Sequence, residues 1–265
     1  MQGADGGPAL AATRFGPVYS LIVSGKYEAP GRKELEGRCE AIYRVLGPLW
    51  PDARPLLEYG DCFELLCAVM LSAQCTDEQV NRVTPALFSR WPDAEAMAAA
   101  PLDAVAACVH SVGFYRTKAR HLVETAALLV ERHGGQVPGT MGDLLALPGV
   151  GRKTANLVLS ACFGEPGIIV DTHVLRVALR LGLGGRADPA EIEDRISRLV
   201  PRERWTRFSH ALNRHGKHVC TARAPACIRE TGSCPIEDLC PRVGLAQPAR
   251  AHRPGVKAAG RGTPE

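Results

Sequence analysis

The sequence predicts an all-α protein. Apolar residues recur every three or four positions through most of residues 31–240, which is the period of an amphipathic helix. Residues that favour helix N-termini or C-termini bound most of these runs. The one stretch that suggests a strand, residues 167–170, is too short to form a sheet by itself.

The first half of this region contains four predicted helices. Asp61 favours the N-cap of one, and Thr76 with Gln79 three positions later has the form of a capping box at the start of another. Pro92 and Pro101 are predicted to lie in short turns. The four helices are predicted over residues 35–46, 63–71, 76–88 and 116–133, the last ended by Gly134-Gly135.

The second half contains five more predicted helices. Gly149 and Gly151 separate the first two, and Asp188 followed by Pro189 has the form of an N-cap with proline at the first helical position. These helices are predicted over residues 140–147, 152–163, 171–183, a run that begins at residue 189, and residues 203–219.

The composition is that of a globular chain of one large or two small domains, with 265 residues, 46% of them hydrophobic and 23% charged. The longest apolar runs, residues 65–71 and 104–109, fall far short of the ~20 residues of a membrane span. The net charge is +4, and residues 141–240 carry 14 basic and 11 acidic side chains. A polyanionic partner is therefore expected to meet the C-terminal half.

Both ends of the chain look like mobile tails. Residues 1–30 and 245–265 are rich in Gly, Ala and Pro and have no helical period, and the second of these segments is basic. No secretory signal pattern is present at the start, so an intracellular location, cytoplasmic or nucleoid, is expected.

The cysteines form two sets. Six are scattered and mostly lie in apolar helical patterns, where a thiol acts as a small hydrophobic group: Cys39, Cys62, Cys67, Cys75, Cys108 and Cys162. Four are crowded together: Cys220, Cys227, Cys234 and Cys240. A crowded set in a reducing interior indicates a metal site, and four thiolates suit either zinc or a [4Fe–4S] cluster.

The segment LPGVGRKTA at residues 147–155 is the most specific motif. Gly149 and Gly151 allow a sharp turn and a close approach of backbone to a ligand, and the following helix offers unpaired N–H groups. With Arg152 beside it, this turn is a candidate phosphate site for DNA. The alternative is an ordinary glycine-capped turn between two helices.

Two side chains could supply chemistry beside this motif. Lys153 lies in the first turn of the second helix, and an amine so placed can attack a carbon electrophile and form a Schiff base. Asp171 follows an apolar run and could act as a base or stabilise a cationic sugar while it also caps a helix. The alternatives are a solvated surface lysine and a simple N-cap.

These motifs, in this order, resemble the endonuclease III family of helix-hairpin-helix DNA glycosylases. The resemblance extends over residues 71–240 and includes Leu71-Ser72-Ala73-Gln74, Gly113-Phe114-Tyr115, residues 147–155, residues 170–176 and the four crowded cysteines. It implies two helical lobes. One is a six-helix-type bundle over residues 55–165 that contains the helix-hairpin-helix motif, and the other is an iron–sulfur lobe built from residues 31–54 and 166–244.

The resemblance implies a bifunctional DNA glycosylase and abasic-site lyase of base excision repair that excises oxidised pyrimidines. Lys153 would be the Schiff-base nucleophile and Asp171 its activating carboxylate. Gln74 and Phe114 would fill the gap that a flipped nucleotide leaves in the duplex. Because the family usually has Leu at the position of Phe114, a changed opposite-base preference is expected.

The resemblance also implies a [4Fe–4S] cluster. The family pattern is C-x6-C-x2-C-x5-C, and this chain has four additional residues between Cys227 and Cys234, which are expected to bulge outward. The implied partner is double-stranded DNA that contains oxidised pyrimidines or abasic sites, and a monomer with no membrane contact is expected.

Two other functions remain open at this point. An adenine-mismatch glycosylase of the same superfamily is typically without a lysine at the position of Lys153 and carries an additional C-terminal domain. A non-catalytic DNA-binding module would use its cluster only as a structural or redox-sensing group. Lesion preference depends on the shape of the base pocket and does not follow from these motifs.

Overall fold

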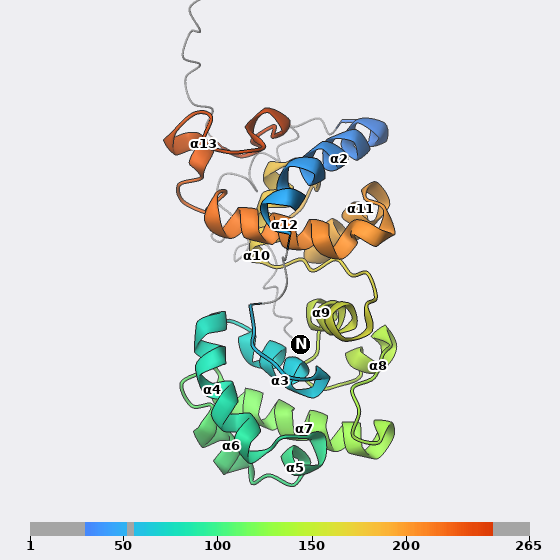
Figure 1. Cartoon of the computed structure of the whole chain (residues 1–265), viewed down its shortest axis with the longest axis vertical. Coiled ribbons are helices and arrows are strands. Elements are labelled where there is room, and N and C mark those ends of the chain that lie inside the picture. Colours follow the sequence, from blue (N-terminus) through green and yellow to red (C-terminus); the bar gives the residue numbers. More distant parts are fainter. Residues whose placement is uncertain (1–29, 52–55, 246–265) are drawn as a thin grey trace, which may run out of the picture.

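The structure is a computed structural model that describes residues 30–51 and 56–245. Within that part of the chain every regular element is helical, which confirms the all-α prediction. The helices gather into two groups, α3 to α9 in one and α2 with α10 to α13 in the other (Figure 1). The predicted tails fall almost entirely outside the described residues, and no described helix is long and apolar enough to span a bilayer.

The elements follow one another along the chain in this order: α2 (Arg32–Leu49), α3 (Cys62–Ser72), α4 (Asp77–Arg90), α5 (Ala94–Ala98), α6 (Leu102–Cys108), α7 (Tyr115–His133), α8 (Met141–Leu145), α9 (Arg152–Phe163), α10 (Thr172–Arg180), α11 (Pro189–Leu199), η1 (Arg202–Arg204), α12 (Trp205–His218), α13 (Ala226–Arg229) and η2 (Glu237–Leu239).

The first group, which we call the bundle, has its own hydrophobic core over residues 57–169. Helix α3 lies at its centre, because every residue from Leu65 to Leu71 is buried and the helix is apolar on all sides. Helices α4, α7 and α9 pack against α3. The bundle therefore holds both α9, which follows the glycine-rich motif, and the end of α3, which leads to Gln74.

The second group, which we call the C-terminal lobe, has a separate core. Helix α10 packs against α12, and α2 packs against both α11 and α12. The face of α2 that enters this core carries Leu35, Cys39, Ile42 and Leu46, which recur at helical spacing. The described part of the chain thus begins in this lobe, continues through the bundle and then returns to the lobe.

Most helix boundaries agree with the capping residues in the sequence. Asp61 accepts a hydrogen bond from the Glu64 amide, and Asp188 caps α11 in the same way. Pro92 and Pro101 lie outside the helices, in the connections before α5 and α6, but these two short helices were not predicted. Residues 167–170 form no strand.

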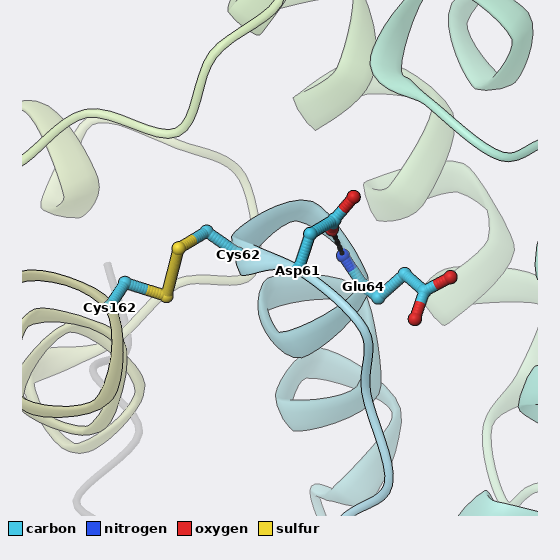
Figure 2. The surroundings of a disulfide bond; sticks show 4 residues. All are labelled: Asp61, Cys62, Glu64 and Cys162. Carbon is cyan, nitrogen blue, oxygen red and sulfur yellow. Dashed lines mark hydrogen bonds between the residues drawn. A yellow bond between two sulfur atoms is a disulfide. The ribbon is translucent and has the colours of Figure 1, made fainter.

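Two of the scattered cysteines are joined by a disulfide rather than being free thiols, which corrects the sequence interpretation. Cys62 begins α3 and Cys162 lies near the end of α9, with Cα atoms 5.8 Å apart (Figure 2). This separation lies within the usual range for a disulfide. The packing of α9 against α3 brings together two residues that are 100 positions apart in the sequence. Cys39 and Cys67 are buried free thiols, as predicted.

Three ion pairs join the described parts of the bundle and the C-terminal lobe, and one of them pairs Arg202 of η1 with Glu165 just after α9, at 2.7 Å. Lys217 on α12 lies 3.1 Å from Asp77 at the start of α4, and Arg152 on α9 lies 2.7 Å from Glu193 on α11. The side chains of Lys217, Asp77 and Glu193 are less than one third exposed. The start of α9, which belongs to the bundle, is therefore also bound to the C-terminal lobe through Arg152.

Candidate functional site

The glycine-rich turn between α8 and α9 is held against α7. Gly149 has a φ of +75°, in the left-handed region that favours glycine, and a Cβ at this position would lie 2.6 Å from Nδ1 of His121. The Thr125 hydroxyl donates a hydrogen bond to the Pro148 carbonyl at 3.0 Å. The turn therefore requires glycine for two independent reasons.

Gly149→Ala is expected to lower the free energy of unfolding by roughly 1–3 kcal/mol, because the new methyl group would meet both an unfavourable φ and the His121 ring. Chemical denaturation measures this change. Gly142→Ala is the matched control, since Gly142 lies in α8 with open space around it, and this change is expected to be neutral or slightly stabilising. Equal effects of the two changes would contradict the role given to the turn.

The N-terminus of α9 is open to solvent. Gly151 is its N-cap, and no described side chain caps its first amides. Arg152 and Lys153 occupy the first turn and are both exposed. Unpaired amides at a helix N-terminus bind anions well, so this end of α9 is suited to a phosphate.

Arg152 is already engaged in the free protein. Its guanidinium forms two hydrogen bonds with the Glu193 carboxylate, at 2.7 and 3.3 Å. The same carboxylate accepts a hydrogen bond from the buried Asn156 amide at 3.1 Å. Glu193 raises the pKa of Arg152 through this pairing. A phosphate that binds Arg152 must share it with Glu193 or displace that carboxylate.

Asp171 is held by both carboxylate oxygens. Oδ1 accepts hydrogen bonds from the His173 and Val174 amides at 3.0 and 2.8 Å, so Asp171 is the N-cap of α10. Oδ2 accepts a hydrogen bond from Nδ2 of Asn213 on α12 at 2.7 Å. The carboxylate is partly buried, and these hydrogen bonds fix its orientation. A fixed orientation suits a carboxylate that acts as a base or stabilises a cation at one defined position.

Lys153 and Asp171 lie on segments that contact each other. One helical turn after Lys153, Asn156 donates a hydrogen bond to the Ile168 carbonyl at 3.1 Å, and Ile168 shortly precedes Asp171. Lys153 belongs to the bundle, whereas Asp171 begins a helix of the C-terminal lobe. Both residues therefore lie where the two lobes meet.

Two histidines lie close to Asp171. Burial lowers the pKa of His173. Burial, with a smaller contribution from Arg214, lowers the pKa of His210 to about 4, although the Asp171 carboxylate opposes this shift. At neutral pH His210 therefore adds no positive charge near Asp171.

The low pKa of His210 predicts acid destabilisation. Below the unfolded-state value of 6.5 the unfolded chain binds a proton that the folded chain does not, so stability is lost as the pH falls from about 6.5 towards 4. Between pH 7 and pH 4 we expect the wild type to lose roughly 3 kcal/mol more than His210→Gln does. Urea denaturation of both proteins over this pH range measures the difference. If the unfolding free energies of the two proteins fall equally with pH, the low pKa of His210 is refuted.

Gln74 and Phe114 share an unusual backbone conformation. Their φ angles are +57° and +58°, in a region that residues other than glycine rarely adopt. Both side chains are exposed, and that of Phe114 is 68% exposed. Backbone strain of this kind persists where the surrounding structure enforces it, commonly at ligand sites.

The four crowded cysteines line one cavity. It lies between α10, the end of α12 and the segment that follows α12, and its other lining residues are mainly apolar. The Arg180 side chain, only 3% exposed, enters from α10, and Nη1 donates to the Cys220 sulfur at 3.1 Å and to the Thr221 carbonyl at 2.8 Å. Nη2 donates to the Ala222 carbonyl at 2.9 Å.

Four thiols are the donor set that an iron–sulfur cluster requires. Burial raises the pKa of Cys234 to about 11 and that of Cys240 to about 12, so without iron these thiols stay protonated. Among the described side chains, Arg180 Nε and His215 Nδ1 are buried without a hydrogen-bond partner. No three described His, Cys, Asp or Glu side chains are arranged around a single metal ion.

Three residues of this site escaped the sequence reasoning: Arg180, Glu193 and Asn213. Each acts through a partner that is distant in the sequence, so no local motif marks it. Arg180 gives one usable signal, because a charged residue inside the apolar run from Val177 to Leu183 implies a buried polar partner.

The comparisons with known proteins show the family of this chain. Residues 67–202 match the HhH-GPD superfamily of base excision DNA repair proteins. The chain belongs to this superfamily. Endonuclease III of Synechocystis sp. is 46% identical over 205 residues, which are 77% of this chain and 92% of that protein. Endonuclease III of Bacillus subtilis is 43% identical over 196 residues, 74% of this chain and 88% of that protein.

A solved structure of an endonuclease III is also similar to this chain. The structure of a trapped endonuclease III–DNA covalent intermediate matches with a TM-score of 0.73 and 40% identity, over 79% of this chain and 96% of that one. Within the superfamily, the chain is a member of the endonuclease III family, which confirms the resemblance. It is a DNA glycosylase and abasic-site lyase of base excision repair.

Proposed function

We propose that this enzyme excises oxidised pyrimidines from double-stranded DNA and cleaves the strand at the resulting abasic site. The observation that carries the proposal is the meeting of α9 and the Asp171 segment, which brings an exposed lysine and an oriented carboxylate to one boundary between the lobes. The glycine-rich turn beside them offers open amides for a DNA phosphate.

Lys153 is the proposed catalytic nucleophile. Its neutral amine attacks C1′ of the flipped nucleotide, and the damaged base leaves with the electron pair of the glycosidic bond and takes up a proton. The amine gives up a proton, and the C1′–O4′ bond then breaks, with O4′ taking up a proton, so that the opened sugar carries an iminium between Nζ and C1′. The iminium withdraws electrons, so the 2′ proton is lost and the 3′ phosphate leaves by β-elimination. Asp171 accepts the amine proton or stabilises the cationic sugar, and Asn213 orients its carboxylate.

Gln74 and Phe114 are the proposed gap-filling residues. A base inside a duplex is out of reach, and extrusion of the nucleotide costs a few kcal/mol. Gln74 would hydrogen-bond the unpaired base, and the exposed Phe114 ring would insert between base steps. Gly149, Gly151 and Arg152 would hold the backbone phosphate beside the flipped nucleotide.

Cys220, Cys227, Cys234 and Cys240 would hold a [4Fe–4S] cluster, the cofactor known from the endonuclease III family. When bound, the cluster supplies iron–thiolate bonds that fix the segment after α12 as a folded unit. The two buried, unpartnered nitrogens of Arg180 and His215 support a polar occupant of this cavity.

The domain division also belongs to this proposal. The bundle would correspond to a domain over residues 55–165, and residues 31–54 with 166–244 would form the iron–sulfur domain. The two separate hydrophobic cores support this division. The protein would act as a monomer, in the cytoplasm or nucleoid.

Borohydride trapping tests the function. The protein is incubated at one salt concentration with duplexes that contain thymine glycol, an abasic site or an A·G mismatch, with and without borohydride. We expect covalent adducts and strand cleavage with the first two duplexes only. Excision of adenine without an adduct would favour the adenine-mismatch glycosylase, and binding without any excision would favour a non-catalytic module.

A further inference from the structure

Lys118 is a buried lysine that lies between the two segments carrying the proposed gap-filling residues. It is on α7, one turn after Phe114, and is only 7% exposed. Its Nζ donates hydrogen bonds to the Leu71 carbonyl at 2.8 Å and to the Ala73 carbonyl at 2.6 Å. These carbonyls lie at the end of α3, immediately before Gln74.

Other contacts join the same two segments. The side-chain amide of Gln79, just after the Gln74 segment, donates to the Ser111 hydroxyl at 2.7 Å, just before Phe114. A Cβ added to Gly113 would lie 3.8 Å from the Gln74 carbonyl, so the two backbones are close neighbours. The segments that end in Gln74 and Phe114 therefore form one connected surface, and Lys118 lies beneath it.

A buried ammonium is costly, and this cost makes the placement of Lys118 informative. Burial lowers the pKa of Lys118. The carbonyls that it contacts are at the C-terminal end of α3, where the helix dipole favours a cation. The lysine thus satisfies carbonyls that the end of a helix leaves without partners, and it fixes the path of the chain into the left-handed residue Gln74.

We infer that Lys118 is a positioning residue that holds Gln74 and Phe114 as one insertion unit, so that both side chains enter the duplex together. The inference rests on the gap-filling roles in the proposed function. It adds that the two roles are coupled and that the coupling depends on a residue that touches neither DNA nor the reacting atoms.

The test uses the full protein with Lys118→Met, Lys118→Arg and the control Leu129→Ala, a buried position farther along α7. Insertion is followed by the fluorescence of 2-aminopurine placed opposite a tetrahydrofuran abasic analogue in a duplex. Lys118→Met is expected to slow insertion and duplex excision at least tenfold. Cleavage of an abasic site in single-stranded DNA, where no gap must be filled, should change less than twofold.

Two further results are expected. Lys118→Arg, which can still donate to both carbonyls, should recover most of the insertion rate. Leu129→Ala should lower Tm yet leave the fluorescence signal unchanged. Equal losses on single-stranded and duplex DNA, or a lower Tm with normal insertion, would overturn the inference, because a purely structural lysine would behave in that way.

A double-mutant cycle tests the coupling without changing Lys118. If Gln74 and Phe114 act as a unit, the effects of Gln74→Ala and Phe114→Ala on insertion will be strongly non-additive. Additive effects would overturn the inference while leaving gap filling intact. If neither change alters the fluorescence, the gap-filling roles themselves fail, and the inference fails with them.

Discussion

Lys153→Ala is expected to abolish both the borohydride-trapped adduct and strand cleavage at abasic sites. The change removes the only amine in the first turn of α9, which is exposed beside the glycine-rich turn. Without a nucleophile no iminium forms, so single-turnover cleavage should fall by at least about 10³-fold. Gel separation of trapped adducts and of cleaved strands measures both effects.

Two variants separate nucleophilicity from charge. Lys153→Arg keeps a cation at the helix N-terminus but cannot form a Schiff base, so it should bind DNA normally and give no adduct. Lys33→Ala removes an exposed lysine from α2 and should leave the adduct unchanged. An adduct of normal yield with Lys153→Ala would move the nucleophile to another residue.

Asp171→Asn is expected to slow base excision by roughly 10²- to 10⁴-fold while DNA binding persists. Asparagine is also a good N-cap, so the hydrogen bonds to the His173 and Val174 amides can be kept. The change therefore removes the negative charge with little effect on α10. Single-turnover excision from a thymine glycol duplex gives the rate.

Asp188→Asn is the matched control for this prediction. Asp188 caps α11 through the Ala190 amide, as Asp171 caps α10, but it is exposed and plays no part in the proposed site. It should leave excision within twofold of the wild type. Near-normal excision by Asp171→Asn, or an equal loss in both variants, would show that Asp171 is only a cap.

Local sequence patterns predicted much of this molecule because their causes are local. Asp61, Asp171 and Asp188 were predicted at helix N-termini, and each accepts hydrogen bonds from amides two or three positions later. The same reasoning missed α5 and α6, since a proline before a short helix has the same appearance as a turn.

Contacts between distant segments were not predictable from those patterns. Thr76 caps α4 as expected, but Gln79 does not complete the capping box, because its side chain donates to Ser111 instead. Asn213 is 42 positions from Asp171. No residue spacing encodes either contact, since each arises only when separate helices pack together.

The left-handed backbone at Gln74 and Phe114 was also beyond prediction. Rules for positive φ favour Gly, Asn and Asp, and neither residue belongs to that set. The family resemblance identified both positions because they belong to sequence motifs of the family, not because of their backbone conformation. The structure adds that the two candidates share a strained conformation, which local preferences oppose and the neighbouring segments enforce.

The order of elements has a consequence for synthesis on the ribosome. Among the described helices α2 is the first to leave the exit tunnel, yet its packing partners α11, α12 and η2 are translated after the whole bundle. During that interval the bundle can fold, whereas the apolar face of α2 stays exposed to solvent because its packing partners have not yet been synthesised. A stalled or truncated nascent chain that ends before α11 would therefore contain a folded bundle and, N-terminal to it, a helix with an exposed apolar face. Chaperones bind exposed apolar segments of this kind.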